Sequence, residues 1–176
     1  MARYVITGGP CTGKTTTLRE IMARGYAVVE ETARDIISNE REKSEKDKSY
    51  SPILPWTNIS RFQRLVAEEQ MRREEQATAI PVFIDRGLMD NLAYIQVFGG
   101  QLDDITASIV SRARYSKIFF LEQVPYVLDA ARREDPELGR RIHEAIYEVY
   151  SSSKMEVLKV PWMAVQDRAN FILCNL

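Results

Sequence analysis

The chain has 176 residues, 45% of them hydrophobic, which is enough for one real core and too little for two comfortable domains. We therefore expect a single domain over residues 1–176. Its 24 Lys and Arg residues nearly balance 25 Asp and Glu residues, and this excludes the broad positive field of a protein that binds nucleic acid or an anionic membrane.

The cysteines and the lack of long apolar runs indicate in which cellular compartment the protein is expected. Cys11 and Cys174 lie far apart without the spacing of a metal site, which argues against a disulfide framework. No stretch approaches the roughly 18 apolar residues of a membrane helix, and the first residues lack a secretory pattern. We expect a cytoplasmic protein without membrane contact.

The first third of the chain alternates strands with helices. Residues 4–7 are mostly apolar and β-branched and end at a glycine, which predicts a buried parallel strand. A helix follows, because apolar residues recur at helical spacing up to Gly25. Residues 27–29 predict a second strand and residues 32–38 a second helix, whereas the polar stretch 39–50 predicts an exposed, mobile loop.

The remainder continues the alternation. Asn58 or Ser60 can cap a long helix that Pro81 stops, and Asp135-Pro136 can open another. Further strands are expected at residues 82–85, 117–121 and 156–160, with helices at 89–98, 106–114 and after 164. This order predicts a parallel sheet covered on both faces, with ligands beyond the carboxyl ends of its strands.

The segment after the first strand carries a phosphate-binding motif. Two glycines stand four residues apart and are followed by Lys14 and Thr15, and the segment runs through Gly8, Gly9, Pro10, Cys11, Thr12, Gly13, Lys14, Thr15 and Thr16. Glycines let backbone N–H groups face an anion at a helix N-terminus. We expect Lys14 to be exposed at this loop and to reach the β and γ phosphates, and Thr15 to ligate magnesium. We predict the three-layer α/β fold of P-loop nucleoside triphosphate hydrolases with a five-stranded parallel sheet, binding ATP and Mg²⁺.

Asp85 ends an apolar strand, where a carboxylate can hold the magnesium together with Thr15. The next residue is Arg86, whereas mechanical ATPases usually place Glu there to polarise water. An arginine beside the γ-phosphate can stabilise the transferred group, which favours transfer over hydrolysis. The alternative is a structural ion pair between Asp85 and Arg86.

Several segments together resemble a known family. They are residues 6–16, 28–34, 62–63, 82–88 and 160–173. They resemble single-domain P-loop proteins labelled AAA-type ATPases, which look like the kinase domain of ribosylnicotinamide kinases and, more distantly, deoxynucleoside kinases. The chain lacks the Asp-Glu pair and the additional helical domain of ring-forming ATPases, so the resemblance implies a kinase-like protein.

The resemblance also implies roles for individual residues. Glu31 looks like the base that accepts the acceptor's hydroxyl proton in deoxynucleoside kinases, although Glu30 is adjacent and a solvated acidic turn is the alternative. Phe62-Gln63 resembles a pair whose Gln reads a nucleobase, but Phe62 also fits plain packing.

Basic residues stand where similar kinases have a lid that closes over the phosphates. They are Arg132, Arg133, Arg140 and Arg141, with a solvated basic helix face as the alternative. His143, the only histidine, has no Cys or His partners spaced for a metal, which favours packing.

The predicted function is an ATP-dependent kinase of a small, nucleoside-like substrate with a hydroxyl group. The predicted catalytic residues are Lys14, Glu31, Asp85, Arg86, Arg132 and Arg133. Two alternatives stay open: a hydrolase of nucleoside or organic triphosphates such as thiamine triphosphate, and a nucleotide-dependent switch whose 39–50 segment meets a protein. The expected partners are ATP and a small acceptor, without nucleic acid, and the oligomeric state is open.

Overall fold

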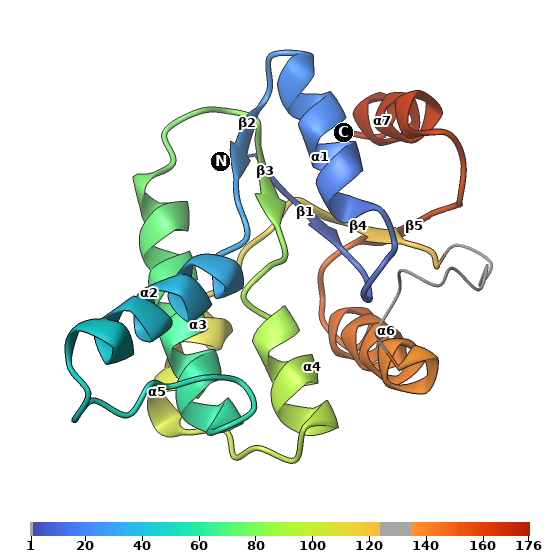
Figure 1. Ribbon diagram of the computed structural model, residues 1–176. Coiled ribbons are helices and arrows are strands. Elements are labelled where there is room, and N and C mark those ends of the chain that lie inside the picture. Colours follow the sequence, from blue (N-terminus) through green and yellow to red (C-terminus); the bar gives the residue numbers. More distant parts are fainter. Residues whose placement is uncertain (1, 124–134) are drawn as a thin grey trace.

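The computed structural model describes residues 2–123 and 135–176. Within these residues, five strands form one parallel sheet in the order β2-β3-β1-β4-β5 (Figure 1). The strands are β1 (Arg3–Thr7), β2 (Ala27–Val29), β3 (Val82–Asp85), β4 (Lys117–Leu121) and β5 (Val157–Val160). The helices are α1 (Lys14–Ala23), α2 (Ala33–Lys46), α3 (Ile59–Gln76), α4 (Asp90–Val97), α5 (Asp104–Ser111), α6 (Pro136–Ser151) and α7 (Val165–Cys174). The predicted fold class is confirmed.

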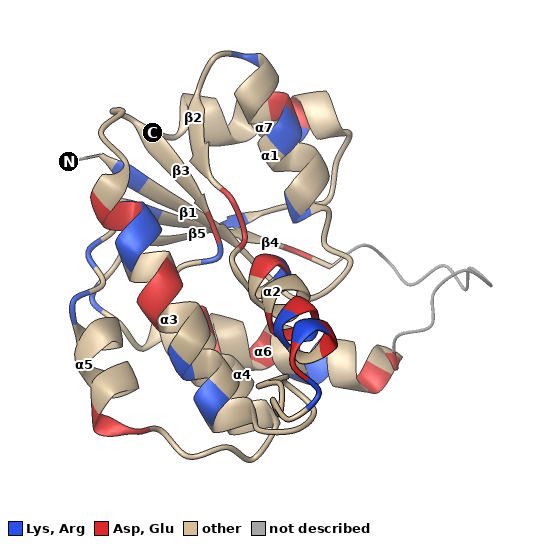
Figure 2. Ribbon diagram, turned by 60° about the vertical axis from the view of Figure 1, so that its left-hand side comes forward, with Lys and Arg blue, Asp and Glu red and all other residues tan. Residues whose placement is uncertain are grey.

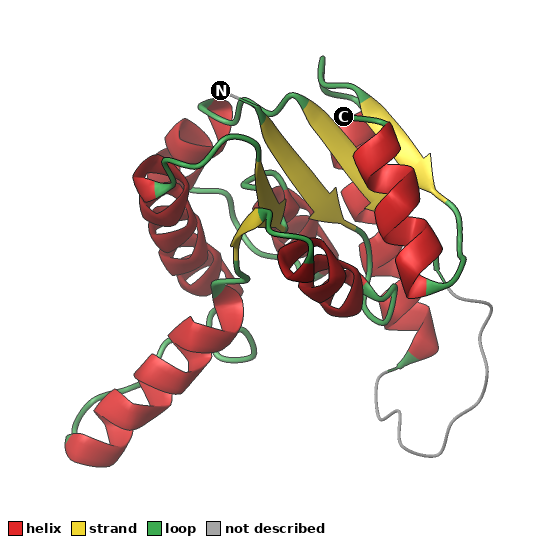
Figure 3. Ribbon diagram, turned by 90° about the horizontal axis from the view of Figure 1, so that it is seen from above, coloured by secondary structure: helices red, strands yellow, loops and turns green. Residues whose placement is uncertain are grey.

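Adjacent residues of the central strands point to opposite faces of the sheet, because side chains alternate along a strand. Val5, Ile84 and Ile118 pack in one core cluster with residues of α4 and α6. Their neighbours Ile6, Phe83 and Phe119 pack in a second cluster with residues of α1 and α7. Figure 3 shows the resulting three layers, with helices on both sides of the sheet. A strand that is covered on both faces needs apolar side chains at nearly every position, and the sequences of these central strands have them.

The carboxyl ends of the parallel strands meet at one edge of the sheet. β1 and β3 are neighbours in register, with Ile6 opposite Asp85, so the segment after Thr7 and the end of β3 lie together. β2 lies on the other side of β3 and leads to Glu31. Ligand sites of open parallel sheets form at this edge.

The polar stretch after residue 38 differs from its prediction. α2 continues to Lys46, so most of the expected loop is helix. Lys46 pairs with Glu42 one turn away, and Figure 2 shows charges of both signs along α2. Glu40 is buried and accepts hydrogen bonds from the Tyr50 hydroxyl at 2.7 Å and from the Ile53 amide at 2.9 Å. The chain after α2 is therefore anchored to the helix.

Two predicted helix starts are confirmed. The Asn58 side chain accepts a hydrogen bond from the Arg61 amide at the start of α3, and Asp135 caps α6 ahead of Pro136. Among the described helices, none combines the length and apolarity needed to cross a lipid bilayer.

Candidate active site

The phosphate-binding segment forms a turn between β1 and α1. Gly13 has φ +83°, a left-handed conformation that favours glycine. A Cβ atom at Gly13 would lie 2.5 Å from Nη1 of Arg168, so a larger residue would also collide with that side chain. The turn and the first residues of α1 line a cleft of about 750 Å³. Its lining includes Pro10, Cys11, Thr12, Gly13, Lys14, Thr15 and Thr16.

Lys14 is buried, with 7% of its surface exposed, so the expectation of an exposed loop lysine is wrong. Its Nζ donates to the carbonyl oxygens of Gly8 at 2.9 Å and Gly9 at 2.6 Å. Burial, together with the nearby Arg86 charge, lowers the pKa of Lys14 to about 7. Two backbone carbonyls of the segment thus hold the Lys14 side chain, which lines the cleft.

α7 supports the segment from outside the cleft. Arg168 is buried and donates from Nη1 to the Thr12 carbonyl at 2.9 Å and to the Thr17 hydroxyl at 3.4 Å. Its Nη2 donates to the Met163 carbonyl at 3.3 Å. Nothing in the local sequence around Arg168 indicates this contact, because its partners lie some 150 residues earlier.

Asp85 ends β3 beside the phosphate-binding segment, where the sequence predicts a magnesium ligand. Burial raises the pKa of its carboxyl group to about 6, and Arg86 opposes that shift. Its Oδ1 is buried and has no hydrogen-bond partner among the described residues, as expected of an oxygen that a cation would satisfy. Thr15 is exposed in the first turn of α1.

The described residues hold no cluster of three or more His, Cys, Asp or Glu side chains that could bind a metal by itself. One carboxylate and one hydroxyl suit magnesium that takes its other ligands from phosphate oxygens and water. Asp85 and Thr15 therefore fit the expected ion.

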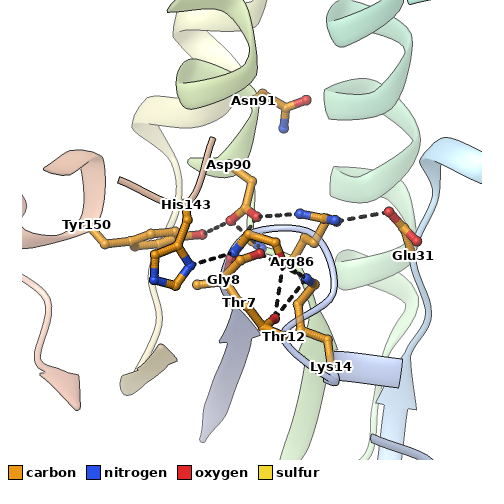
Figure 4. A network of polar contacts seen from close by, with 12 residues as sticks. Thr7, Gly8, Thr12, Lys14, Glu31, Arg86, Asp90, Asn91, His143 and Tyr150 are labelled. Carbon is orange, nitrogen blue, oxygen red and sulfur yellow. Dashed lines mark hydrogen bonds and ion pairs between the residues drawn. The ribbon is translucent and has the colours of Figure 1, made fainter. Parts of the chain in front are cut away.

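Arg86 lies between two carboxylates (Figure 4). Its Nε donates to Glu31 Oε1 at 2.9 Å, and its Nη1 lies 3.5 Å from Asp90 Oδ2. Burial opposes its charge, but Tyr94, Glu31 and Asp90 outweigh burial and raise the pKa of Arg86 above its ordinary value. Arg86 forms ion pairs with Glu31 and Asp90. It forms none with Asp85, so the structural ion pair of Asp85 and Arg86 that the sequence left open is not the one found.

Asp90 holds this arrangement from α4. It is 3% exposed, and its carboxylate accepts hydrogen bonds from the Thr7 hydroxyl at 2.7 Å and the Tyr150 hydroxyl at 2.8 Å. The backbone of Arg86, with φ +64°, is held separately because Gln70 Nε2 donates to its carbonyl. Sequence reasoning missed both Asp90 and Gln70.

A second cavity, of about 270 Å³, lies on the other side of Arg86. Its apolar lining comes from Ile37, Pro55, Ile59, Phe62, Val66, Tyr94 and Phe98. Gln63 and Asn91 add amide groups, both buried. Asn91 donates to the Leu88 carbonyl, while its Oδ1 has no hydrogen-bond partner in the described part of the chain. The cavity therefore combines aromatic surface with amide groups.

The neighbouring residues Phe62 and Gln63 differ in their surroundings. Phe62 packs with Ile36 and Val66 in a small core cluster, as the packing alternative predicts, and its ring also borders the cavity. Gln63 lines the cavity beside it.

The two cavities share a wall. Glu31, Arg34, Arg86 and Tyr94 line both of them. Glu30 is exposed and lines neither, so position separates the two acids that the sequence left open. Glu31 also pairs with Arg34, Oε2 to Nε, at 3.3 Å.

The expected lid arginines are placed only in part. Arg132 and Arg133 lie outside the described residues. Arg140 is exposed and pairs with Glu137 and Glu144, and neither it nor Arg141 lines the two cavities. These two arginines match the alternative of a solvated basic helix face.

The family model of an AAA domain matches residues 3–168. The chain belongs to this family. This confirms the family predicted from its sequence motifs, and no curated protein matches the chain.

Several solved structures have the same fold as this chain. Deoxyadenosine kinase from M. mycoides with bound dATP has a TM-score of 0.68 and 14% identity over 98% of both chains. The NadR protein in complex with NR has a TM-score of 0.67 and 14% identity, covering 99% of this chain and 51% of that chain. Thymidylate kinase from Candida albicans has a TM-score of 0.62 and 12% identity, covering 99% and 89%. At these identities the likeness shows the fold.

Proposed function

We propose that the chain is an ATP-dependent kinase that phosphorylates a hydroxyl group of a small, nucleoside-like acceptor. The shared wall between the two cavities carries this proposal. A hydrolase needs a phosphate cleft and a positioned water, whereas here a second cavity with aromatic and amide groups adjoins the cleft at Glu31 and Arg86. A kinase needs that arrangement because two substrates must meet in line.

On the phosphate side, backbone N–H groups between Cys11 and Thr16 and the N-terminus of α1 hold the nucleotide phosphates. Lys14 lines this cleft, and its amino group is the proposed contact of the β and γ phosphates. The Thr15 hydroxyl and Asp85 are the residues that would hold magnesium, which supplies positive charge to the β and γ phosphates when bound.

At the shared wall, Glu31 is the proposed general base. A carboxylate can accept the proton of an acceptor hydroxyl as that oxygen attacks the γ-phosphorus. Arg86 holds Glu31 by a hydrogen bond and presents a buried positive charge to the transferred phosphoryl group. Asp90 contacts the guanidinium group of Arg86, and Gln70 donates to its carbonyl oxygen. The orientation of the Arg86 side chain therefore does not depend on a bound acceptor.

In the second cavity, the stacked pair Tyr94 and Phe98 suits a planar ring of the acceptor. Gln63 and Asn91 offer amide donors and acceptors for its edge. Solved structures of the same fold, deoxyadenosine kinase with dATP and NadR with NR, support a nucleoside-like acceptor.

The test is ADP release from ATP and magnesium across a panel of nucleosides and vitamins. We expect release to depend on one group of nucleoside-like acceptors, with a phosphorylated product detected by mass spectrometry. Equal release with and without every acceptor would contradict the kinase and favour the triphosphate hydrolase. Tight nucleotide binding without turnover would contradict it and favour the switch.

A further inference from the structure

His143, on α6, makes a polar contact with the phosphate-binding segment that packing alone does not explain. Its Nδ1 accepts a hydrogen bond from the Gly9 amide at 3.0 Å. Its ring also packs against Phe120, with ring centroids 4.5 Å apart. The packing expected from the sequence is present, and the hydrogen bond is an addition that the sequence did not indicate.

The N–H of Gly9 and the carbonyl of Gly8 belong to the same peptide group. The carbonyl accepts from Lys14 Nζ at 2.9 Å, while the N–H donates to His143 (Figure 4). A peptide group is planar, so its two ends turn together. His143 and Lys14 therefore hold one peptide plane from opposite ends, and a rotation that breaks one hydrogen bond also disturbs the other.

The imidazole is suited to accept because it stays neutral. Burial and the Lys14 charge lower the pKa of His143 to about 4; Glu144 opposes this shift and Lys159 adds to it. A neutral ring that accepts at Nδ1 carries its proton on Nε2. At neutral pH the acceptor is thus available to Gly9.

The close approach of α6 requires glycine at position 9. A Cβ atom there would lie 2.7 Å from the Cβ of His143 and 3.2 Å from the Gly139 carbonyl oxygen. A real Cβ atom does not sit this close to a neighbour, so a larger residue would push α6 away and break the hydrogen bond. The hydrogen bond to His143 therefore requires glycine at position 9.

We propose that His143 is a positioning residue that sets the orientation of the Gly8–Gly9 peptide and, through it, of Lys14 for nucleotide binding. The role couples α6 to the phosphate cleft. It requires a nucleotide in that cleft but does not depend on which acceptor, if any, receives the phosphoryl group.

A matched pair of variants tests the acceptor atom. In His143→Asn, the amide oxygen can take the place of Nδ1, whereas His143→Leu has a similar shape without an acceptor. We expect His143→Leu to weaken ATP binding by about fivefold to tenfold, the size of one lost neutral hydrogen bond, and His143→Asn to stay within about twofold of the parent. Calorimetric titration with ATP gives the Kd, and thermal unfolding without nucleotide is the control that both variants are folded at the temperature of the titration.

Two results would overturn the proposal. His143→Leu binding ATP as tightly as the parent would show that the hydrogen bond does not position the segment. Equal weakening in both variants would assign the effect to lost packing against Phe120. A parent that binds ATP but needs no acceptor for turnover would contradict the kinase proposal and leave this one standing.

Discussion

The two sides of the proposed site are built from different parts of the chain. The phosphate side is formed largely by consecutive residues, and its geometry rests on backbone groups and on the carbonyls that hold Lys14. The acceptor side is formed by side chains from the start of α2, the loop before α3, and α3 and α4, which the fold brings together. A backbone site recognises what all nucleotides share, whereas a side-chain cavity can select one acceptor.

The sides meet at Glu31 and Arg86. Each lines both cavities, and Arg86 is held by a hydrogen bond to its carbonyl and by carboxylates at its guanidinium group. Substitutions on the phosphate side should therefore remove all turnover, those at the meeting point should remove transfer, and those in the acceptor cavity should change affinity for one substrate.

The largest effect is expected for Lys14→Met, which keeps an apolar stem in a buried position and removes the charge. Turnover should fall by about a thousandfold or more, because the phosphates lose their cationic partner in a water-poor site. ADP release measures this. Thermal unfolding without nucleotide is the control for folding, and an unchanged rate in a folded variant would contradict the assignment of the phosphate cleft.

Next in size is Glu31→Gln, with Glu30→Gln as its matched control. Losing a general base should lower acceptor-dependent turnover by about a hundredfold, while background ATP hydrolysis changes little. Glu30→Gln should behave like the parent because Glu30 is exposed and lines neither cavity. Equal losses of transfer and background hydrolysis in Glu31→Gln would indicate that Glu31 positions water.

Asp85→Asn should act through magnesium. We expect the magnesium concentration for half-maximal activity to rise by about tenfold, because a carboxylate oxygen is replaced by a weaker ligand. ATP binding without metal should stay within about twofold of the parent. Titrations of magnesium and of metal-free ATP measure the two effects, and an unchanged magnesium dependence would make Asp85 structural.

The contrast between the two sides also explains what the sequence could predict. The phosphate segment is local, so its glycines, Lys14 and Thr15 could be recognised from spacing alone, and the strands from their apolar runs. The length of α2 could not be predicted, because the polar residues of its second half form a solvated helix without an apolar pattern. Its one buried acid, Glu40, accepts hydrogen bonds from residues that follow the helix.

Contacts between distant residues left no signal either. Asp90 joins Thr7 to Tyr150, and Arg168 and His143 reach the phosphate segment from more than 130 residues away. Each is a polar residue on a helix, and its burial depends on packing that only the folded chain defines.

The smallest effect, and the finest test of the comparison, concerns the neighbours Phe62 and Gln63. Gln63→Leu removes an amide from the acceptor cavity while keeping an apolar side chain, so the KM for the acceptor should rise by about fivefold. The KM for ATP should not change, because Gln63 does not line the phosphate cleft.

Phe62→Leu is the matched control, since Phe62 is 2% exposed and packs with Ile36 and Val66. It should lower the free energy of unfolding by about 1 kcal/mol and change the acceptor KM less than Gln63→Leu does. Steady-state kinetics and denaturant unfolding of both variants separate the two effects. If Gln63→Leu loses stability but keeps its acceptor KM, Gln63 is a packing residue and the acceptor's edge is recognised elsewhere in the cavity.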